Sequence, residues 1–189
     1  MKVFLTGVSC VGKTTIGAKL ASLLGYPFFD LDHEIETFFG KPLERLQAEC
    51  LSKQAFRKKA CQALRHLLTQ EETEKCVVAL PPSGLMGEYP RLIKEAGGIA
   101  VVLEDTPENI LARITFYDAD SQPIIKKLTE QENRYYLRDI RSDITYFNRT
   151  YRKADGTVGI SGLGVMASAT KVRDFLVERY ELASCSIHS

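Results

Sequence analysis

The residues with the most specific spacing stand near the start of the chain. Residues 7–14 read Gly-Val-Ser-Cys-Val-Gly-Lys-Thr and fit the pattern G-x-x-x-x-G-K-S/T. In such a loop the glycines let backbone N–H groups point at a polyphosphate, the lysine adds positive charge and the threonine hydroxyl binds Mg²⁺. We therefore expect nucleotide phosphates to be bound by Gly7, Ser9, Cys10, Val11, Gly12, Lys13, Thr14 and Thr15.

The sequence around this loop supports the interpretation. Residues 3–5 form a short apolar run that predicts a buried strand, and after the loop Ile16, Leu20 and Leu23 recur at helical spacing before Gly25. The helix predicted there would present its positive end to the phosphates. A glycine-rich turn that binds nothing is the alternative.

Two carboxylates follow the second apolar run. Asp30 and Asp32 come directly after Phe28 and Phe29, where a second strand should end at the carboxyl edge of an open sheet. Residues two apart on an extended segment share a face. One carboxylate could bind Mg²⁺ while the other accepts or orients the proton of an attacking hydroxyl. Alternatively, Asp32 caps a helix and Asp30 is a solvated loop residue.

Basic residues at helical spacing form two further candidate sites. Arg57 follows Phe56 and could clamp a carboxylate, although a basic run on a helix is equally consistent with a solvated face. Arg134, Arg138 and Arg141 could contact phosphates or an anionic substrate, but taken alone they fit a solvated stripe better.

Composition limits the class of protein. With 189 residues, 44% of them apolar, 26% charged and a net charge of +1, we expect one domain over residues 1–189 that binds a small anionic molecule rather than nucleic acid. No apolar run approaches the roughly 18 residues of a membrane span, and no leader pattern opens the chain. Five scattered cysteines indicate reduced thiols. We expect a cytoplasmic monomer that does not bind membranes.

The alternation of apolar runs and helical segments predicts an α/β fold. Runs at 3–5, 27–29, 76–80, 99–103 and 158–160 predict a five-stranded parallel sheet, and longer helical segments separate them. Apolar stripes over residues 52–70 and 168–182 predict two of the helices that flank the sheet.

One region interrupts this alternation. Residues 116–125 are polar, contain Asp and Pro, and lead into a charged stretch over 126–153. A long loop of this kind in a compact domain is often a lid, and kinases use a lid to exclude water from the phosphoryl group. We place the lid at about residues 116–133.

Taken together, and in this order along the chain, the motifs resemble the shikimate kinase family. The resemblance rests on the phosphate loop, Asp30 with Asp32, Phe56-Arg57, the turn at 81–84, the lid, and Arg141 followed by Tyr146, and it extends to about residue 182. It implies the three-layer sandwich of P-loop kinases with a lid.

The resemblance also implies an activity and residue roles. The family transfers the γ-phosphoryl group of ATP, with Mg²⁺, to the 3-hydroxyl of shikimate. By matching motifs, Lys13 and Asp32 would be catalytic, Thr14 and Asp30 would bind Mg²⁺, and Arg57 with Arg141 would hold the substrate carboxylate. The resemblance further implies that Arg113 lies on the adenine, with an adenine-contacting loop near 162–164.

The chain departs from the family pattern in two places. Where the family has three glycines after the third strand, this chain has Pro81 and Pro82, which lack an N–H, so only Ser83 and Gly84 remain as backbone donors to a substrate. In the lid, Gln122 replaces an arginine whose charge stabilises phosphoryl transfer, and Lys126 or Lys127 could substitute for it.

These departures leave other functions open. The altered turn is compatible with a kinase that phosphorylates another hydroxylated carboxylic acid or a polyol. Gln122 is compatible with a catalytically inactive regulatory protein that binds nucleotide. A structural module with an unused loop would have no affinity for nucleotide.

Overall fold

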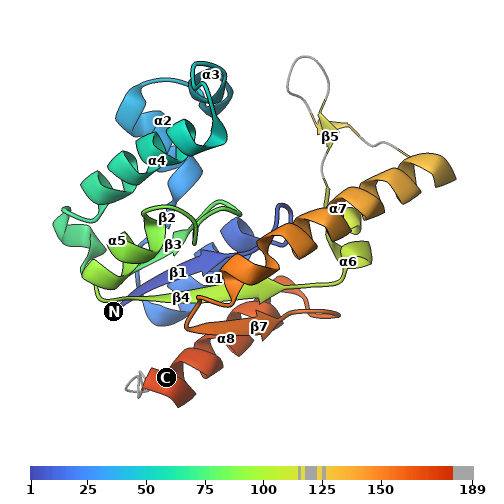
Figure 1. Cartoon of the computed structure of the whole chain (residues 1–189). Helices are drawn as coiled ribbons and strands as arrows, with labels where there is room; N and C mark the ends of the chain where they lie inside the picture. The colour runs from blue at the N-terminus through green and yellow to red at the C-terminus, as the bar shows by residue number, and fades with distance from the viewer. Residues whose placement is uncertain (115, 118–122, 125–126, 181–189) are drawn as a thin grey trace.

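The computed structural model describes residues 1–114, 116–117, 123–124 and 127–180. Its centre is the predicted five-stranded parallel sheet, in the order β2-β3-β1-β4-β7 (Figure 1). Each strand coincides with one of the apolar runs to within two residues. The strands are β1 (Lys2–Thr6), β2 (Phe28–Asp30), β3 (Cys76–Ala79), β4 (Gly98–Glu104) and β7 (Gly156–Gly159).

The two strands next to each other at the centre of the sheet are buried on both faces. Val3, Phe4 and Leu5 of β1 and Val77 and Val78 of β3 have no exposed surface. Parallel strands covered on both sides read as continuous apolar runs rather than alternating ones, which is why the sequence located them.

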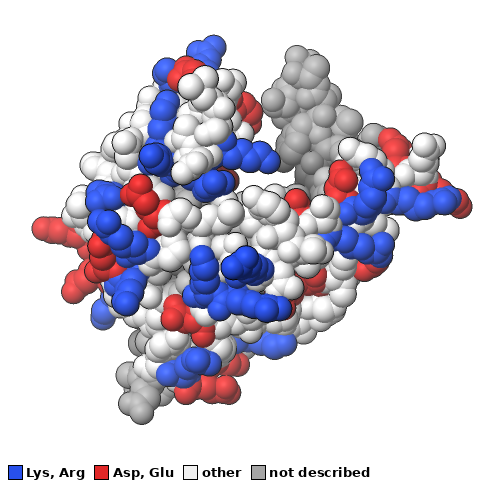
Figure 2. Space-filling view, in the orientation of Figure 1, with Lys and Arg blue, Asp and Glu red and all other residues white. Residues whose placement is uncertain are grey.

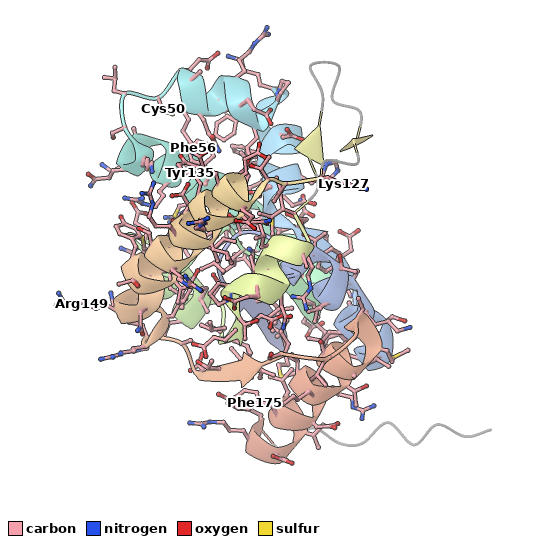
Figure 3. All side chains as sticks on the ribbon, turned by 90° about the vertical axis from the view of Figure 1, so that its right-hand side faces the viewer. Cys50, Phe56, Lys127, Tyr135, Arg149 and Phe175 are labelled. Atoms are coloured by element: carbon pink, nitrogen blue, oxygen red, sulfur yellow. The ribbon has the colours of Figure 1, made fainter. Side chains whose placement is uncertain are left out.

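Helices cover both faces of the sheet and make the predicted three layers. Helices α1 (Lys13–Leu24) and α8 (Val165–Tyr180) pack against each other on one face, whereas α5 (Tyr89–Glu95) and α7 (Glu130–Tyr151) lie on the other (Figures 1 and 3). None of the described helices is both long and apolar enough to cross a membrane.

Three helices between β2 and β3 form an arm at one side of the molecule. This arm consists of α2 (Leu31–Phe39), α3 (Leu43–Ala48) and α4 (Lys53–Leu67), and the 3₁₀ turn η1 (Glu71–Thr73) then leads to β3. The helix predicted over 52–70 is α4, which begins after Ser52 because the Ser52 hydroxyl accepts a hydrogen bond of 3.1 Å from the Ala55 N–H.

The charged stretch that follows β4 and α6 (Pro107–Ala112) is largely one helix. The Thr129 side chain and Glu132 form a capping box, so α7 begins at Glu130 and includes the last four residues of the predicted lid. The preceding residues contain an antiparallel pair, β5 (Phe116–Tyr117) and β6 (Pro123–Ile124). Gln122, Lys126, Cys185 and residues 181–182 lie outside the described residues.

Hydrogen bonds from two different elements fix the proline-containing turn after β3. The Thr6 hydroxyl donates to the Pro81 carbonyl at 3.2 Å, and the Tyr151 hydroxyl donates to the Pro82 carbonyl at 3.1 Å. The end of β1 and the end of α7 are thereby tied to the same two residues.

We predict that Tyr151→Phe destabilises the protein, because it leaves the Pro82 carbonyl without its donor. The loss should be about 1 kcal/mol, which corresponds to a fall in melting temperature of about 2–4 °C for a chain of this size. Tyr135→Phe, the same change at an exposed position of α7, is the matched control. Equal melting temperatures for the two variants in calorimetry would contradict the prediction.

Candidate active site

The phosphate loop between β1 and α1 has a backbone that glycine makes possible. Gly7 and Gly12 have φ angles of +149° and +107°, which side-chain-bearing residues rarely adopt. A Cβ on Gly7 would lie 2.6 Å from the Leu103 carbonyl oxygen of β4. Cys10 also has a positive φ, of 59°. The loop is therefore held in a turned conformation close to the neighbouring strand.

Lys13, the first residue of α1, lies folded over this loop. Its ammonium donates hydrogen bonds to the carbonyls of Gly7 at 3.1 Å and Val8 at 3.0 Å. Burial lowers the pKa of Lys13 to about 8, although the carboxylates of Asp32 and Asp30 act in the opposite direction. Added phosphate charge at the loop would favour the protonated lysine.

The two candidate carboxylates have different local roles. Asp30 is the N-cap of α2, because its Oδ1 accepts from the Asp32 N–H at 3.1 Å, so the capping alternative applies to Asp30 and not to Asp32. Oδ2 of Asp30 accepts from the Thr14 hydroxyl at 2.6 Å. The two predicted Mg²⁺ ligands, Thr14 and Asp30, are thus in direct contact.

Asp32 lies in the first turn of α2, and its carboxylate does not cap the helix. Desolvation raises the pKa of this carboxyl above its ordinary value, and the neighbouring Asp30 raises it further, while Lys13 lowers it. A carboxylate with a raised pKa is a better proton acceptor than an ordinary surface aspartate.

A cavity of about 600 Å³ opens over the phosphate loop. It brings together residues from the loop, the carboxylate pair, the turn after β3 and the start of α8. Its lining includes all the predicted phosphate-binding residues except Gly7. The lining residues are Ser9, Cys10, Val11, Gly12, Lys13, Thr14, Thr15, Ile16, Asp30, Asp32, Ala79, Leu80, Pro82, Arg113, Leu163, Gly164, Val165 and Ser168.

Arg113 lines this cavity at the end of α6, opposite the start of α8. Its guanidinium forms an ion pair of 2.6 Å with Asp105 and donates to the Val11 carbonyl at 3.4 Å. Although burial opposes ionisation of Asp105, hydrogen bonds from Asn109, Thr106 and Arg113 hold the pKa of its carboxyl below the usual value. The fixed guanidinium and the loop that contains Leu163 and Gly164 line the same cavity as Asp32.

A second cavity, of about 520 Å³, lies between the arm and the turn after β3. Figure 2 shows the hollow between the arm and the body of the molecule, and Figure 3 shows Cys50 and Phe56 on the arm. Three residues, Ser9, Asp32 and Pro82, line both cavities. The other lining residues are Leu43, Gln47, Cys50, Ser52, Lys53, Phe56, Arg57, Pro81, Ser83, Met86, Tyr146 and Phe147.

Arg57 lies in the second cavity, as its expected role requires. The Nε atom of Arg57 is buried and has no hydrogen-bond partner among the described residues. A buried charged donor without a partner is costly. A carboxylate bound in this cavity would place an acceptor beside the Arg57 guanidinium.

Arg141 lies elsewhere. Its guanidinium forms an ion pair of 2.9 Å with Glu108, in which the two side chains are 60% and 58% exposed, and it lines neither cavity. Tyr146, five residues further along α7, does line the second cavity. Five residues turn a helix by about 140° net, so Arg141 and Tyr146 face different sides of α7.

Ser83 and Gly84 also differ from each other. Ser83 lines the second cavity. The N–H of Gly84 instead donates to the Pro81 carbonyl at 2.8 Å, and a Cβ there would lie 2.5 Å from the Leu80 Cβ. Gly84 therefore closes the turn and does not offer an N–H to a substrate, which corrects the sequence-based expectation for this residue.

Several residues that line the two cavities were not among those that the sequence motifs predicted. Lys53 stands four residues before Arg57 and shares its cavity, and this spacing on a predicted helix was the available signal. Ser168, at the start of α8, has a buried hydroxyl without a hydrogen-bond partner among the described residues. No motif marked Ser168 in advance.

Comparison with known proteins gives a consistent family. A family model described as shikimate kinase matches residues 9–158. The shikimate kinase of Chlorobium limicola is 38% identical over 125 residues, and the alignment covers 66% of this chain but only 59% of that protein. The shikimate kinase of Chlorobium phaeobacteroides is 43% identical over 144 residues, covering 73% of this chain and 72% of that protein.

Solved structures support the same fold. The shikimate kinase of Bacteroides thetaiotaomicron has a TM-score of 0.74 at 22% identity and covers 93% of this chain and 98% of that one. The shikimate kinase of Acinetobacter baumannii in complex with shikimate has a TM-score of 0.72 at 25% identity, with coverages of 95% and 94%.

We predict that polyphosphate binding weakens at alkaline pH through Lys13. Below about pH 8 the lysine is protonated with or without ligand. Above that pH the free protein loses the proton, whereas the phosphate-bound protein retains it because the anion raises its pKa, so binding must take up a proton. Calorimetric titration with ADP and Mg²⁺ in buffers of different ionisation enthalpy measures this uptake. Equal uptake at pH 7 and pH 9 would contradict the assignment.

Proposed function

The chain belongs to the shikimate kinase family, and from this premise we propose that it transfers the γ-phosphoryl group of ATP to a hydroxyl of shikimate. The observation that carries the proposal is the meeting of the two cavities at Ser9, Asp32 and Pro82. The phosphate loop lines one cavity, and Arg57, whose Nε is buried without a hydrogen-bond partner among the described residues, lines the other. A donor and an acceptor bound in these cavities would meet beside Asp32.

The donor side binds and positions the phosphates. The N–H groups of the loop and the positive end of α1 face a polyphosphate placed over the loop. The Lys13 ammonium, which contacts the carbonyls of Gly7 and Val8, would turn to the phosphate oxygens. Arg113 and the loop before α8 also line this cavity, and the adenine would lie against them.

The contact between Thr14 and Asp30 fits a magnesium site. Mg²⁺ prefers oxygen ligands and usually combines one or two protein oxygens with phosphate oxygens and waters. No group of three or more metal-binding side chains occurs among the described residues, so phosphate oxygens would complete the coordination. When bound, Mg²⁺ would neutralise charge on the transferring phosphoryl group.

In the proposed reaction, Asp32 accepts the proton of the acceptor hydroxyl. The acceptor oxygen forms a bond to the γ-phosphorus, the bond from that phosphorus to the bridging oxygen of ADP breaks, and the hydroxyl proton passes to the Asp32 carboxylate. The raised pKa of Asp32 suits this carboxyl to receive the proton. Arg57, which lines the second cavity together with Asp32, would hold the acceptor carboxylate and thereby fix which hydroxyl reaches Asp32.

The proline-containing turn favours one alternative, a kinase that acts on another hydroxylated carboxylic acid. The carbonyls of Pro81 and Pro82 accept hydrogen bonds from Thr6 and Tyr151, so the wall of the second cavity that they form is rigid and poor in donors. Carboxylic acids and polyols with other ring hydroxyls distinguish this alternative in the same assay.

The proposed activity is tested by ADP release with Mg²⁺ and ATP, with and without shikimate. Strong stimulation by shikimate is the expected result. ATP binding without stimulation by shikimate or by any acid or polyol in the panel would indicate a regulatory nucleotide-binding protein instead.

We predict that Asp32→Asn lowers kcat by about 10²- to 10⁴-fold, because an amide cannot accept the hydroxyl proton. The affinity for ATP should change little, since phosphate binding depends on the loop and Lys13. Glu34→Gln, the same chemical change in the same turn of α2, is the control and should retain activity. An active Asp32→Asn enzyme with only a lower melting temperature would assign Asp32 a structural role.

A further inference from the structure

The second cavity, in which the acceptor is proposed to bind and which is called the acceptor cavity from here on, has two basic side chains in its described lining. Both come from α4. They are Lys53 and Arg57, which are four residues apart and therefore lie one above the other on the same face of the helix. Asp32 is the acidic residue of the same lining. The charged groups of the described lining thus stand at two places: a cationic site on α4 and the carboxylate of Asp32.

The environment of Lys53 is electropositive before any ligand binds. Lys53 is the first residue of a 15-residue helix whose first turn contains no acidic residue. A cation at the positive end of a helix is locally unfavourable. Within the described part of the chain, the Lys53 ammonium has neither a hydrogen bond nor an ion pair. An anion between Lys53 and Arg57 would relieve the repulsion at both.

Four apolar or aromatic residues share the cavity with this cationic pair: Phe56, Met86, Tyr146 and Phe147. Lys53 is exposed and Arg57 is partly buried, so both cations are accessible to an anion that enters the cavity. The ion pair of Arg141 with Glu108 lies on another side of α7 and lines neither cavity.

We propose that Lys53 is the second cation that binds the acceptor carboxylate, together with Arg57, and that Arg141 does not contact the acceptor. This inference rests on the proposed function and names a specificity-determining residue for it. Arg57 supplies directed hydrogen bonds and Lys53 supplies a point charge on the other carboxylate oxygen. The carboxylate would then be bound entirely from the arm.

The first test compares steady-state kinetics of three variants with shikimate and ATP. Lys53→Met should raise the KM for shikimate by roughly ten- to a hundredfold, the range for one hydrogen bond to a charged group, with little change in kcat or in the KM for ATP. Lys53→Arg should recover most of the loss. Lys58→Met, at an exposed position of the same helix outside the cavity, and Arg141→Met should resemble the unchanged enzyme.

A second acceptor separates a charge contact from a structural effect. Shikimate methyl ester keeps the ring and its hydroxyls but has no negative charge. The unchanged enzyme and Lys53→Met should have similar KM values for the ester, because the lysine has no charge to meet. A KM for the ester that rises as much as the KM for shikimate would show that Lys53 shapes the cavity and would overturn the proposal.

The remaining outcomes are also decisive. An unchanged KM for shikimate in Lys53→Met, with a raised one in Arg141→Met, overturns the proposal and leaves the proposed function intact. An unchanged enzyme that neither phosphorylates shikimate nor binds it in calorimetry overturns the proposed function, and the proposal with it.

Discussion

The close approach of the phosphate loop to β4 is the constraint on which the rest of the structure depends. The Gly7 position leaves no space for a side chain, since the Leu103 carbonyl would lie 2.6 Å from a Cβ. The loop that follows β1 therefore passes close to β4, with which β1 pairs on one side, while β3 pairs with β1 on the other. These three strands are parallel and end at the same edge of the sheet. Lys13, Asp105 and the turn at Pro81, each of which follows one of these strands, therefore lie at that edge.

The parts of the fold that the sequence predicted well are those governed by local burial. Buried parallel strands are continuous apolar runs, and all five were located to within two residues. Helix α7 was harder to recognise, because only Ile140 and Tyr151 of its 22 residues are buried. Its start is set by the capping box at Thr129, a local signal inside the segment that the sequence analysis assigned to the lid.

The site residues also fall into two groups: those whose position follows from the local sequence and those whose position depends on tertiary packing. The phosphate loop and the Asp30–Asp32 pair lie within a few residues of strand ends, so their spacing alone placed them at the cavity. Arg141 and Lys53 depend on which face of a helix meets the cavity, and that is decided by the packing of distant segments. Arg141 and Tyr146 point in directions about 140° apart around α7, so Arg141 pairs with Glu108 whereas Tyr146 lines the second cavity. The role of Gly84 depended on a hydrogen bond within its own turn, which composition does not reveal.

The arm has a consequence for how such an enzyme diversifies. Residues 31–67 form one uninterrupted insertion between neighbouring strands, and they supply most of the polar groups of the second cavity, whereas the groups proposed to bind the phosphates come from the sheet edge. Asp32, at the base of the arm, is the one arm residue in the described lining of both cavities. Ser9 of the phosphate loop and Pro82 of the turn after β3 are the other two shared residues. Substitutions in this insertion at positions other than Asp32 would change the second cavity without changing the described lining of the first. The two cavities can therefore vary separately, except at the three residues that they share.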